Sequence, residues 1–203
     1  MKRFSLFASL AVLIFLPSSA FAQGRAQIDK PTFEELPSPE LNAGKNKAFK
    51  PKNWLEIEAK MRIPAQSREQ KDAGYIDQVT VKWYVALKSK DRAAHILLVT
   101  KDITHINVPV DADIYSSVYL SPMSMVRLTG NDRGGKMAVE SVGIEVLVNG
   151  VKVGEESTKG TAGWWNSPSD KISRNEKIPL LNKYETPFKI FWWDRYAEIE
   201  EKK

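Results

Sequence analysis

Cysteine is absent from the 203-residue sequence, and histidine occurs only as His95 and His105. Without thiols the chain forms neither disulfide bonds nor thiolate metal sites, so burial of apolar side chains must hold its core together. The absence also excludes the cysteine-linked lipid anchor of bacterial lipoproteins. The two histidines and Asp102 lack a ligand spacing such as H-x-x-x-H, and we expect surface or hydrogen-bonded histidines rather than a metal site.

Signatures of catalysis are missing as well. No G-x-S-x-G elbow presents a serine nucleophile. Glu56 and Glu58 share the polar face of one predicted strand, which is the ordinary pattern of a solvated face and does not place two carboxylates across a cleft. The sequence therefore predicts a protein that is not an enzyme and that has no cofactor.

One glycine-rich stretch, Gly130 to Lys136, has the spacing of a phosphate-binding P-loop up to its lysine. Met137 follows where magnesium ligation requires serine or threonine, and the stretch lies between strand-like segments rather than before a helix. We interpret it as a simple turn that binds no nucleotide.

The charge balance excludes nucleic acid as a partner. The 30 basic and 25 acidic residues leave an excess of +5, and loss of Lys2 and Arg3 with a cleaved leader leaves 28 basic residues and about +3. Phosphate binding needs a concentrated basic face, which so small an excess does not supply.

The first 22 residues have the three parts of a secretory signal peptide. Lys2 and Arg3 precede the apolar run Phe4 to Leu16, which is shorter than the roughly 20 residues that span a bilayer. Small residues in Ala20-Phe21-Ala22 predict cleavage before Gln23. We therefore expect an exported protein in the periplasm, at the outer membrane or at the cell surface, with no membrane span after cleavage.

The mature chain divides into an arm and one domain. Residues 23–52 are polar and contain Pro31, Pro37, Pro39 and Pro51, which predicts a flexible N-terminal arm. Residues 53–203 are within the usual size of a single domain.

Most of this domain is predicted to be β-strand. Apolar and polar residues alternate with a period of two over 54–63 and 75–87, as in half-buried strands, and Trp83 lies on the apolar face. Residues 96–108 predict two strands or one bent strand, 114–120 a strand, 122–128 a short helix or irregular crossing, and 142–153 a hairpin turning at Asn149-Gly150. This pattern indicates an all-β antiparallel sandwich or barrel.

Six tryptophans offer a candidate interaction surface, above all the pairs Trp164-Trp165 and Trp192-Trp193. Adjacent residues in an extended chain point in opposite directions, so we expect one member of each pair to be buried and the other exposed. Exposed tryptophans stack on sugars as well as on proteins. A carbohydrate-binding module therefore remains an alternative to a protein-binding domain.

The C-terminal sequence LLNKYETPF, residues 180–188, and WDRY, residues 193–196, resemble the signature of a family of small exported pilus-like proteins. These proteins come from Verrucomicrobia-type bacteria and are encoded beside type IV pilus components. Residues 54–58, residues 75–77 and the Trp164-Trp165 pair agree in character. The resemblance extends from Trp54 to about Glu198.

The resemblance implies an immunoglobulin-like β-sandwich that acts by contact with other proteins of a pilus or envelope assembly. Glycans are the alternative partner, and the oligomeric state stays open. A true type IV pilin keeps its apolar N-terminal helix, whereas cleavage before Gln23 would remove Phe4 to Leu16 here, which favours an accessory role.

The same C-terminal residues have a predicted structural role. Thr186-Pro187 suits the start or edge of a last strand, from which Phe188, Ile190 and Trp192 would face the core. Asp194 and Arg195 are expected to fix the chain end by a charge-assisted hydrogen bond. Residues 197–203 are predicted to form a terminal helical turn or a frayed tail.

Overall fold

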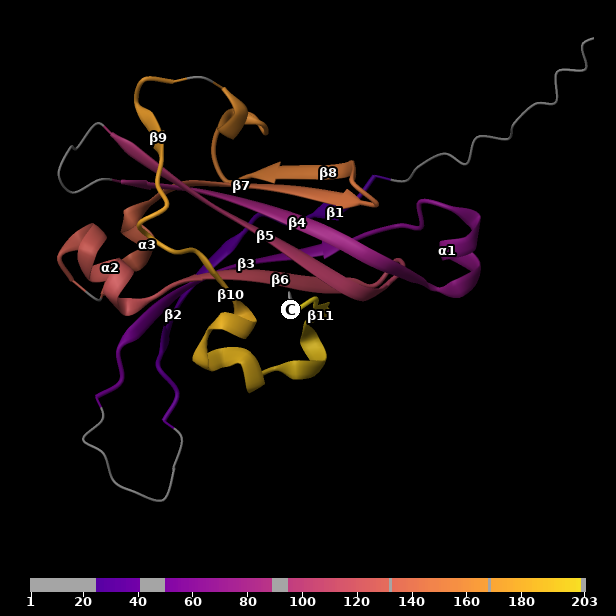
Figure 1. Cartoon of the computed structure of the whole chain (residues 1–203), viewed down its shortest axis with the longest axis horizontal. Helices are drawn as coiled ribbons and strands as arrows, with labels where there is room; N and C mark the ends of the chain where they lie inside the picture. The colour runs from indigo at the N-terminus through magenta and orange to yellow at the C-terminus, as the bar shows by residue number, and fades with distance from the viewer. Residues whose placement is uncertain (1–24, 41–49, 89–94, 132, 168, 202–203) are drawn as a thin grey trace, which may run out of the picture.

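The computed structural model describes residues 25–40, 50–88, 95–131, 133–167 and 169–201 (Figure 1). The predicted signal peptide and residues 23–24 and 41–49 of the predicted arm lie outside the described residues. Within the described ranges, no helix has both the length and the apolar character that a membrane crossing requires.

The strands of the described part form two stacked sheets (Figure 1). The first sheet has β3 (Asn53–Arg62) and β6 (Asp113–Leu120) at its centre, and its other strands are β1 (Gln27–Ile28), β2 (Thr32–Pro37) and β10 (Leu181–Asn182). The second sheet is built on the long central strand β4 (Tyr75–Lys88), with β5 (Ile96–Pro109), β7 (Val139–Val148), β8 (Val151–Ser157), β9 (Ile172–Arg174) and β11 (Glu198–Ile199). All pairings are antiparallel except that of β9 with β5. The predicted antiparallel β-sandwich is confirmed.

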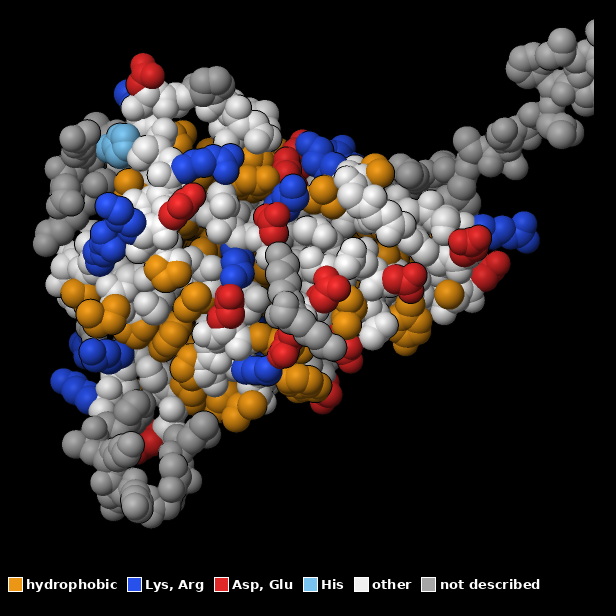
Figure 2. Space-filling model, viewed as in Figure 1, with side chains coloured by type: hydrophobic (Ala, Val, Ile, Leu, Met, Phe, Trp, Pro, Cys, Tyr) orange, Lys and Arg blue, Asp and Glu red, His pale blue; other side chains and the backbone are white. Residues whose placement is uncertain are grey.

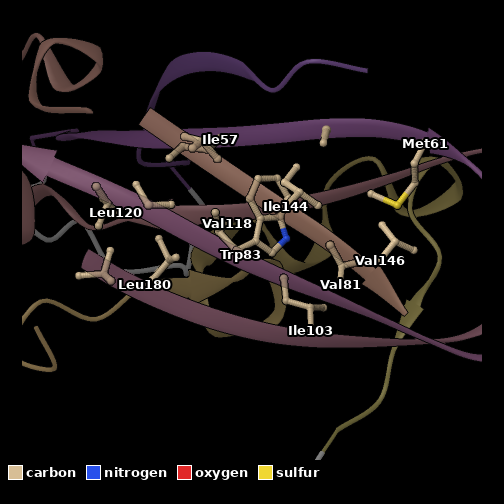
Figure 3. Close-up of a cluster of buried hydrophobic side chains, with 14 of the residues drawn as sticks. Ile57, Met61, Val81, Trp83, Ile103, Val118, Leu120, Ile144, Val146 and Leu180 are labelled. Carbon is tan, nitrogen blue, oxygen red and sulfur yellow. The ribbon is translucent and has the colours of Figure 1, made fainter. Parts of the chain in front are cut away.

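The core fills the space between the two sheets, as the period-two pattern requires. Figure 3 shows side chains from both layers meeting there: Ile57, Met61, Val118 and Leu120 from the first sheet, and Val81, Trp83, Ile103, Ile144 and Val146 from the second. Trp83 has no exposed surface, and its indole Nε1 donates a hydrogen bond of 3.3 Å to Ser116 Oγ on β6. The only polar atom of this large side chain therefore has a partner across the sandwich.

Local signals in the sequence set the hairpin and the helices. Asn149 and Gly150 have φ of 50° and 78°, so both central positions of the β7–β8 turn adopt the predicted left-handed conformation. The crossing after β6 is a helix, α2 (Pro122–Thr129), whose N-cap Ser121 accepts a hydrogen bond from the Ser124 amide. Two further helices, α1 (Arg68–Ala73) and α3 (Gly135–Ala138), are short. The segment 96–108 is one continuous strand, β5.

The prediction of a flexible arm is wrong for the described residues 25–40 and 50–52. Strand β2 pairs with β3 from Thr32 to Pro37, and Asp29 donates its amide to Lys60 O at 2.9 Å. The prolines flank or end the strand and do not interrupt it. The composition of this stretch predicted a flexible arm because its hydrogen-bonding partner, the edge of β3, lies about twenty residues further along the chain. A local reading of composition does not detect such a partner.

The N-terminal strand also ties the two sheets together. While β1 pairs with β3 in the first sheet, Ala26 N donates to Val153 O on β8 in the second sheet at 2.9 Å. A Cβ at Gly154 would lie 2.9 Å from the Cβ of Ala26, so only glycine lets the two backbones approach this closely.

Candidate functional site

The C-terminal segment, residues 181–199, crosses from the first sheet to the second. It leaves β10, makes the 3-10 turns η2 (Lys183–Glu185), η3 (Pro187–Ile190) and η4 (Trp193–Arg195), and ends as β11 on β5. Figure 1 shows these turns, in yellow, beside β6. Two sequence predictions are therefore wrong: Thr186-Pro187 begins a 3-10 turn and not a strand, and residues 198–199 are a strand and not a helical turn or frayed end.

The turn at Pro187 follows from local chemistry. Thr186 is the N-cap, and its Oγ1 accepts a hydrogen bond of 3.2 Å from Phe188 N, while Pro187 occupies the first position, where its missing N–H costs nothing. Of the three side chains expected in the core, only Phe188 is buried. It packs between Trp54 and Tyr119, with ring centroids 5.9 and 5.5 Å away.

The segment covers the outer face of the first sheet, on which two glutamates of β3 lie. The Tyr119 hydroxyl donates to Glu56 Oε1 at 2.5 Å, and Ser117 Oγ donates to the Tyr119 hydroxyl at 3.1 Å. Glu58 accepts hydrogen bonds from the Tyr196 hydroxyl and from Arg195 Nη2, the latter at 2.5 Å. The expectation that Glu56 and Glu58 form an ordinary solvated face is wrong, because Glu56 is 6% exposed and the segment lies over both.

Two cationic side chains of the C-terminal segment, Arg195 and Lys183, make further contacts that stabilise it. The Arg195 guanidinium lies over the Tyr115 ring, 3.9 Å from its centroid, while it bonds to Glu58. Lys183 is buried and donates its ammonium hydrogen to the carbonyl of Phe191, and its Nζ lies 4.5 Å from the Tyr196 ring centroid. The prediction that Asp194 and Arg195 fix the chain end is therefore met for Arg195, with Glu58 as its partner, whereas Asp194 makes none of the hydrogen bonds or ion pairs between described side chains.

Burial changes the acid–base properties of this cluster. Burial is the main cause that raises the pKa of Glu56, and the charges of Glu58 and Glu34 raise it further. Burial likewise raises the pKa of Tyr119 and of Tyr196, while it lowers the pKa of Lys183. The tyrosine hydroxyls therefore remain protonated donors at every physiological pH, as their bonds to the glutamates require.

An exposed aromatic patch, formed by Ile190, Trp192 and Trp193, lies on the outside of the segment. These side chains are 62%, 50% and 53% exposed. Trp193 stacks on Tyr184 with centroids 5.8 Å apart, and Trp192 stacks on Phe188 at 6.5 Å. Figure 2 shows hydrophobic side chains gathered over the position that the segment occupies in Figure 1.

The backbone at Trp192 explains why both indoles are exposed. Trp192 has φ 53° and ψ 40°, the left-handed conformation that bulky residues rarely adopt, and it directly precedes η4. The prediction of one buried and one exposed tryptophan assumed an extended chain. It is wrong at this pair because the chain turns there.

The other tryptophan pair lies apart from the patch, beside the second sheet. Trp165 is 4% exposed and stacks on Tyr84 of β4, with centroids 4.9 Å apart. Trp164 is half-buried and donates a hydrogen bond of 3.0 Å to Ser157 Oγ. Of the four tryptophans predicted as an interaction surface, the structure therefore exposes Trp192 and Trp193 together and packs Trp164 and Trp165 into the fold.

A small pocket opens beside the patch, between Trp192 and the outer face of the first sheet. Its volume is about 170 Å³, and it is lined by Thr32, Glu34, Glu56, Glu58, Trp192, Arg195 and Tyr196. Strand β2 contributes two of these residues, so the corrected arm is part of the site.

The other residues that the sequence singled out take structural roles. His105 is fully buried, with Nδ1 3.2 Å from Ala197 O and Nε2 3.0 Å from Ser116 Oγ, and His95 Nε2 lies 2.7 Å from Ser173 Oγ. Across the described residues, no three histidine, aspartate or glutamate side chains gather in a way that would hold a metal ion. The glycine-rich stretch lies between α2 and the four-residue α3, so the expectation of flanking strands is wrong, and its Gly135 amide donates to Glu35 Oε1 at 2.7 Å. The Gly135 amide, which a bound phosphate would need as a hydrogen-bond donor, thus already donates to the Glu35 carboxylate.

Comparison with known proteins agrees with this fold. A family model matches residues 17–203 of the chain. A crystal structure of a protein from Akkermansia muciniphila is similar, with a TM-score of 0.81 and 36% sequence identity over 88% of this chain and 94% of that chain. No curated protein matches the chain. The predicted resemblance to a family of Verrucomicrobia-type bacteria is confirmed to this extent.

Proposed function

The chain belongs to the protein family whose model matches residues 17–203, and from this premise we propose that it is a non-enzymatic, exported protein that acts by contact with other proteins. The observation that carries the proposal is the exposed aromatic patch. Buried apolar surface is the main favourable term in protein association, and tryptophans dominate the binding energy of many interfaces. Two adjacent, half-exposed tryptophans are therefore strong candidates for interface anchors.

The patch is held on a rigid support. A left-handed conformation at a non-glycine residue costs roughly 1–2 kcal/mol, and such residues persist only where their surroundings determine them. Here the surroundings are the bonds of Arg195 and Tyr196 to Glu58 and the stacking of Trp192 on Phe188. Rigid aromatic side chains lose little entropy on binding, which favours their use in recognition.

The polar cluster below the patch supports binding rather than catalysis. Both carboxylates of β3 accept hydrogen bonds from tyrosine hydroxyls, and Arg195 pairs with Glu58. Arg195 and Tyr196 fasten the segment to Glu58, while Tyr119 bonds to Glu56 within the sheet, and this use leaves neither carboxylate free as a general base.

The sequence of the same segment supports a proposal for the kind of assembly. Residues 180–188 and 193–196 contain Arg195 and Tyr196, whose bonds to Glu58 we call the clamp, and also Trp193 of the patch. These are the residues that resemble the signature of exported pilus-like proteins. With the predicted signal peptide at residues 1–22, they favour an accessory role in a type IV pilus-like or cell-surface assembly, in the periplasm, at the outer membrane or at the surface.

Carbohydrate binding is the second candidate. Trp192 stands beside a pocket whose other lining residues, such as Thr32 and Arg195, offer hydrogen-bonding groups. An indole face next to polar groups also suits a sugar ring, which has an apolar face and hydroxyl edges.

A pull-down from bacterial envelope extract tests the proposal. The bait is the mature chain, residues 23–203, and the altered bait carries Trp192→Asn with Trp193→Ala, because asparagine tolerates the left-handed conformation and preserves the backbone. Met137→Ser, which removes a 77% exposed side chain outside the patch, is the control. Thermal denaturation verifies that all baits are folded.

We expect envelope proteins, pilus components among them, to be retained by the wild type and the control and lost with the double variant. Equal retention by all three baits would refute a role of the patch. Quenching of tryptophan fluorescence by purified oligosaccharides, abolished in the double variant, would instead favour the carbohydrate-binding module.

A further inference from the structure

The pocket beside Trp192 has the size of a single side-chain head group. Its volume is about 170 Å³, well below that of a typical small-molecule site. It is lined by Trp192, Arg195 and Tyr196 of the C-terminal segment and by residues of β2 and β3. Trp192 belongs both to the aromatic patch and to the lining of this pocket, so a partner that packs on Trp192 lies next to the pocket.

The pocket is rich in negative charge. Glu34 on β2 lies directly opposite Glu56 on β3, and like charges in this arrangement repel one another. Glu58 is the next residue on the same face of β3. The charges of Glu34 and Glu58 contribute to the raised pKa of Glu56, so the three carboxylates interact.

The cations nearby already have partners, and one of them, Arg195, lines the pocket itself. Arg195 bonds to Glu58 and lies on Tyr115, and Lys183 bonds to the carbonyl of Phe191 and lies on Tyr196. Glu34 is exposed, and none of the ion pairs between described residues includes it. A positive charge supplied from outside would complement it.

Cation–π contacts elsewhere in the molecule, and one at the pocket residue Tyr196, illustrate how such a charge would bind. Cations lie over Phe33, Tyr115, Tyr184 and Tyr196, at 3.9 to 5.6 Å from their centroids. Among the described contacts, neither Trp192 nor Trp193 has a cation over it, although the indole is the best cation acceptor of the aromatic side chains. Trp192 thus presents an indole face next to an uncompensated carboxylate.

We propose that the patch docks a protein segment that inserts a lysine or arginine side chain between the Trp192 indole and the Glu34 carboxylate, with an apolar neighbour on Trp193. This inference rests on the proposed function and adds the chemistry of the partner. The cation is held by one ion pair and one cation–π contact, and the apolar residue supplies buried area.

Short blocked peptides test the pairing without knowledge of the partner. The probes are Ac-Leu-Lys-Leu-NH2 and Ac-Leu-Arg-Leu-NH2, with Ac-Leu-Gln-Leu-NH2 as the uncharged control. Binding is followed by the ¹⁵N–¹H signals of the six tryptophan indoles, assigned with single tryptophan variants. The protein variants are Glu34→Gln and, as a matched exposed glutamate on α1, Glu69→Gln.

We expect the cationic peptides to shift the Trp192 signal and to bind about fivefold more tightly than the uncharged one, as one cation–π contact and one screened ion pair would give. Glu34→Gln should remove this preference, and Glu69→Gln should retain it. Equal binding of all three peptides, or an undiminished preference in Glu34→Gln, would overturn the inference.

The pull-down separates this inference from the proposed function. If Glu34→Gln retains the same partners as the wild type while the Trp192/Trp193 variant loses them, only the inference about charge fails. If the Trp192/Trp193 variant also retains them, the proposed function itself fails.

Discussion

Lowering the pH from about 8 to about 5 is expected to destabilise the fold by roughly 2 kcal/mol through one residue, His105. Burial lowers the pKa of this imidazole from 6.5 to about 4. An unfolded chain exposes the same ring to water, where it takes up a proton at its ordinary pKa. The unfolded state therefore binds more protons below pH 6.5, and stability is lost as the pH falls towards 4.

The magnitude follows from the size of the pKa shift. A fall in the pKa from 6.5 to about 4 corresponds to about 3 kcal/mol at full effect, of which roughly 2 kcal/mol has appeared at about pH 5. The structural cause is that His105 lies beneath the C-terminal segment, with Nδ1 3.2 Å from the carbonyl oxygen of Ala197 and Nε2 3.0 Å from Ser116 Oγ. Loss of the contact between His105 and Ala197 should weaken the packing of the C-terminal segment, which carries the aromatic patch.

Urea denaturation of the wild type and of His105→Gln, at several pH values, measures the effect. Carboxylates with shifted pKa values, such as Glu56, titrate in both proteins, and so the difference between the two curves isolates His105. If the variant does not fold, NMR titration of the two histidine rings in the wild type gives the pKa directly, with His95→Gln to assign the signals. A pKa of His105 near 6.5, or parallel pH profiles of the two proteins, would refute the reasoning.

Two further substitutions test the packing on either side of the sandwich. Tyr196→Phe removes the hydroxyl that donates to Glu58, and it should lower the free energy of unfolding, measured in urea, by about 1–3 kcal/mol. The control Tyr75→Phe, at a ring that is 55% exposed, should leave the free energy of unfolding unchanged. Similar values for both variants would contradict a stabilising bond between Tyr196 and Glu58. Gly143→Ala places a Cβ 2.1 Å from Cε3 of Trp165, so the indole must leave its stack on Tyr84, with an expected cost of at least about 1–3 kcal/mol and a changed tryptophan emission. An unshifted melting temperature would show that Trp165 has another place to pack.

Several strands were predictable because their signals are local. The alternation in 75–87 exceeds a dozen residues and identified both the strand β4 and the buried side of Trp83. Asn149-Gly150 carries its own turn chemistry, and the structure has the expected positive φ at both residues. Such signals need no knowledge of distant residues.

The candidate site was predictable in part only. Its tryptophans stood out by composition, but their exposure depends on the left-handed backbone at Trp192 and on the 3-10 turn that follows. Glu56 and Glu58 showed the same alternation as a solvated strand, and their partners Arg195 and Tyr196 lie about 140 residues away. Period-two patterning identifies which face of a strand is polar, and it does not indicate whether another segment will cover that face.

Local patterning in the sequence was enough for the all-β class, the apolar face of the long strands and the Asn149-Gly150 turn, because alternation and turn residues act over a few neighbouring positions. The tertiary structure decided the rest. Residues 25–37 are ordered because β3 offers them a ladder partner, and the aromatic patch is exposed because the segment that carries it is bonded to Glu58 and pairs with both sheets. Both outcomes depend on contacts between distant parts of the chain, and these contacts stabilise the protein only after the sandwich has formed.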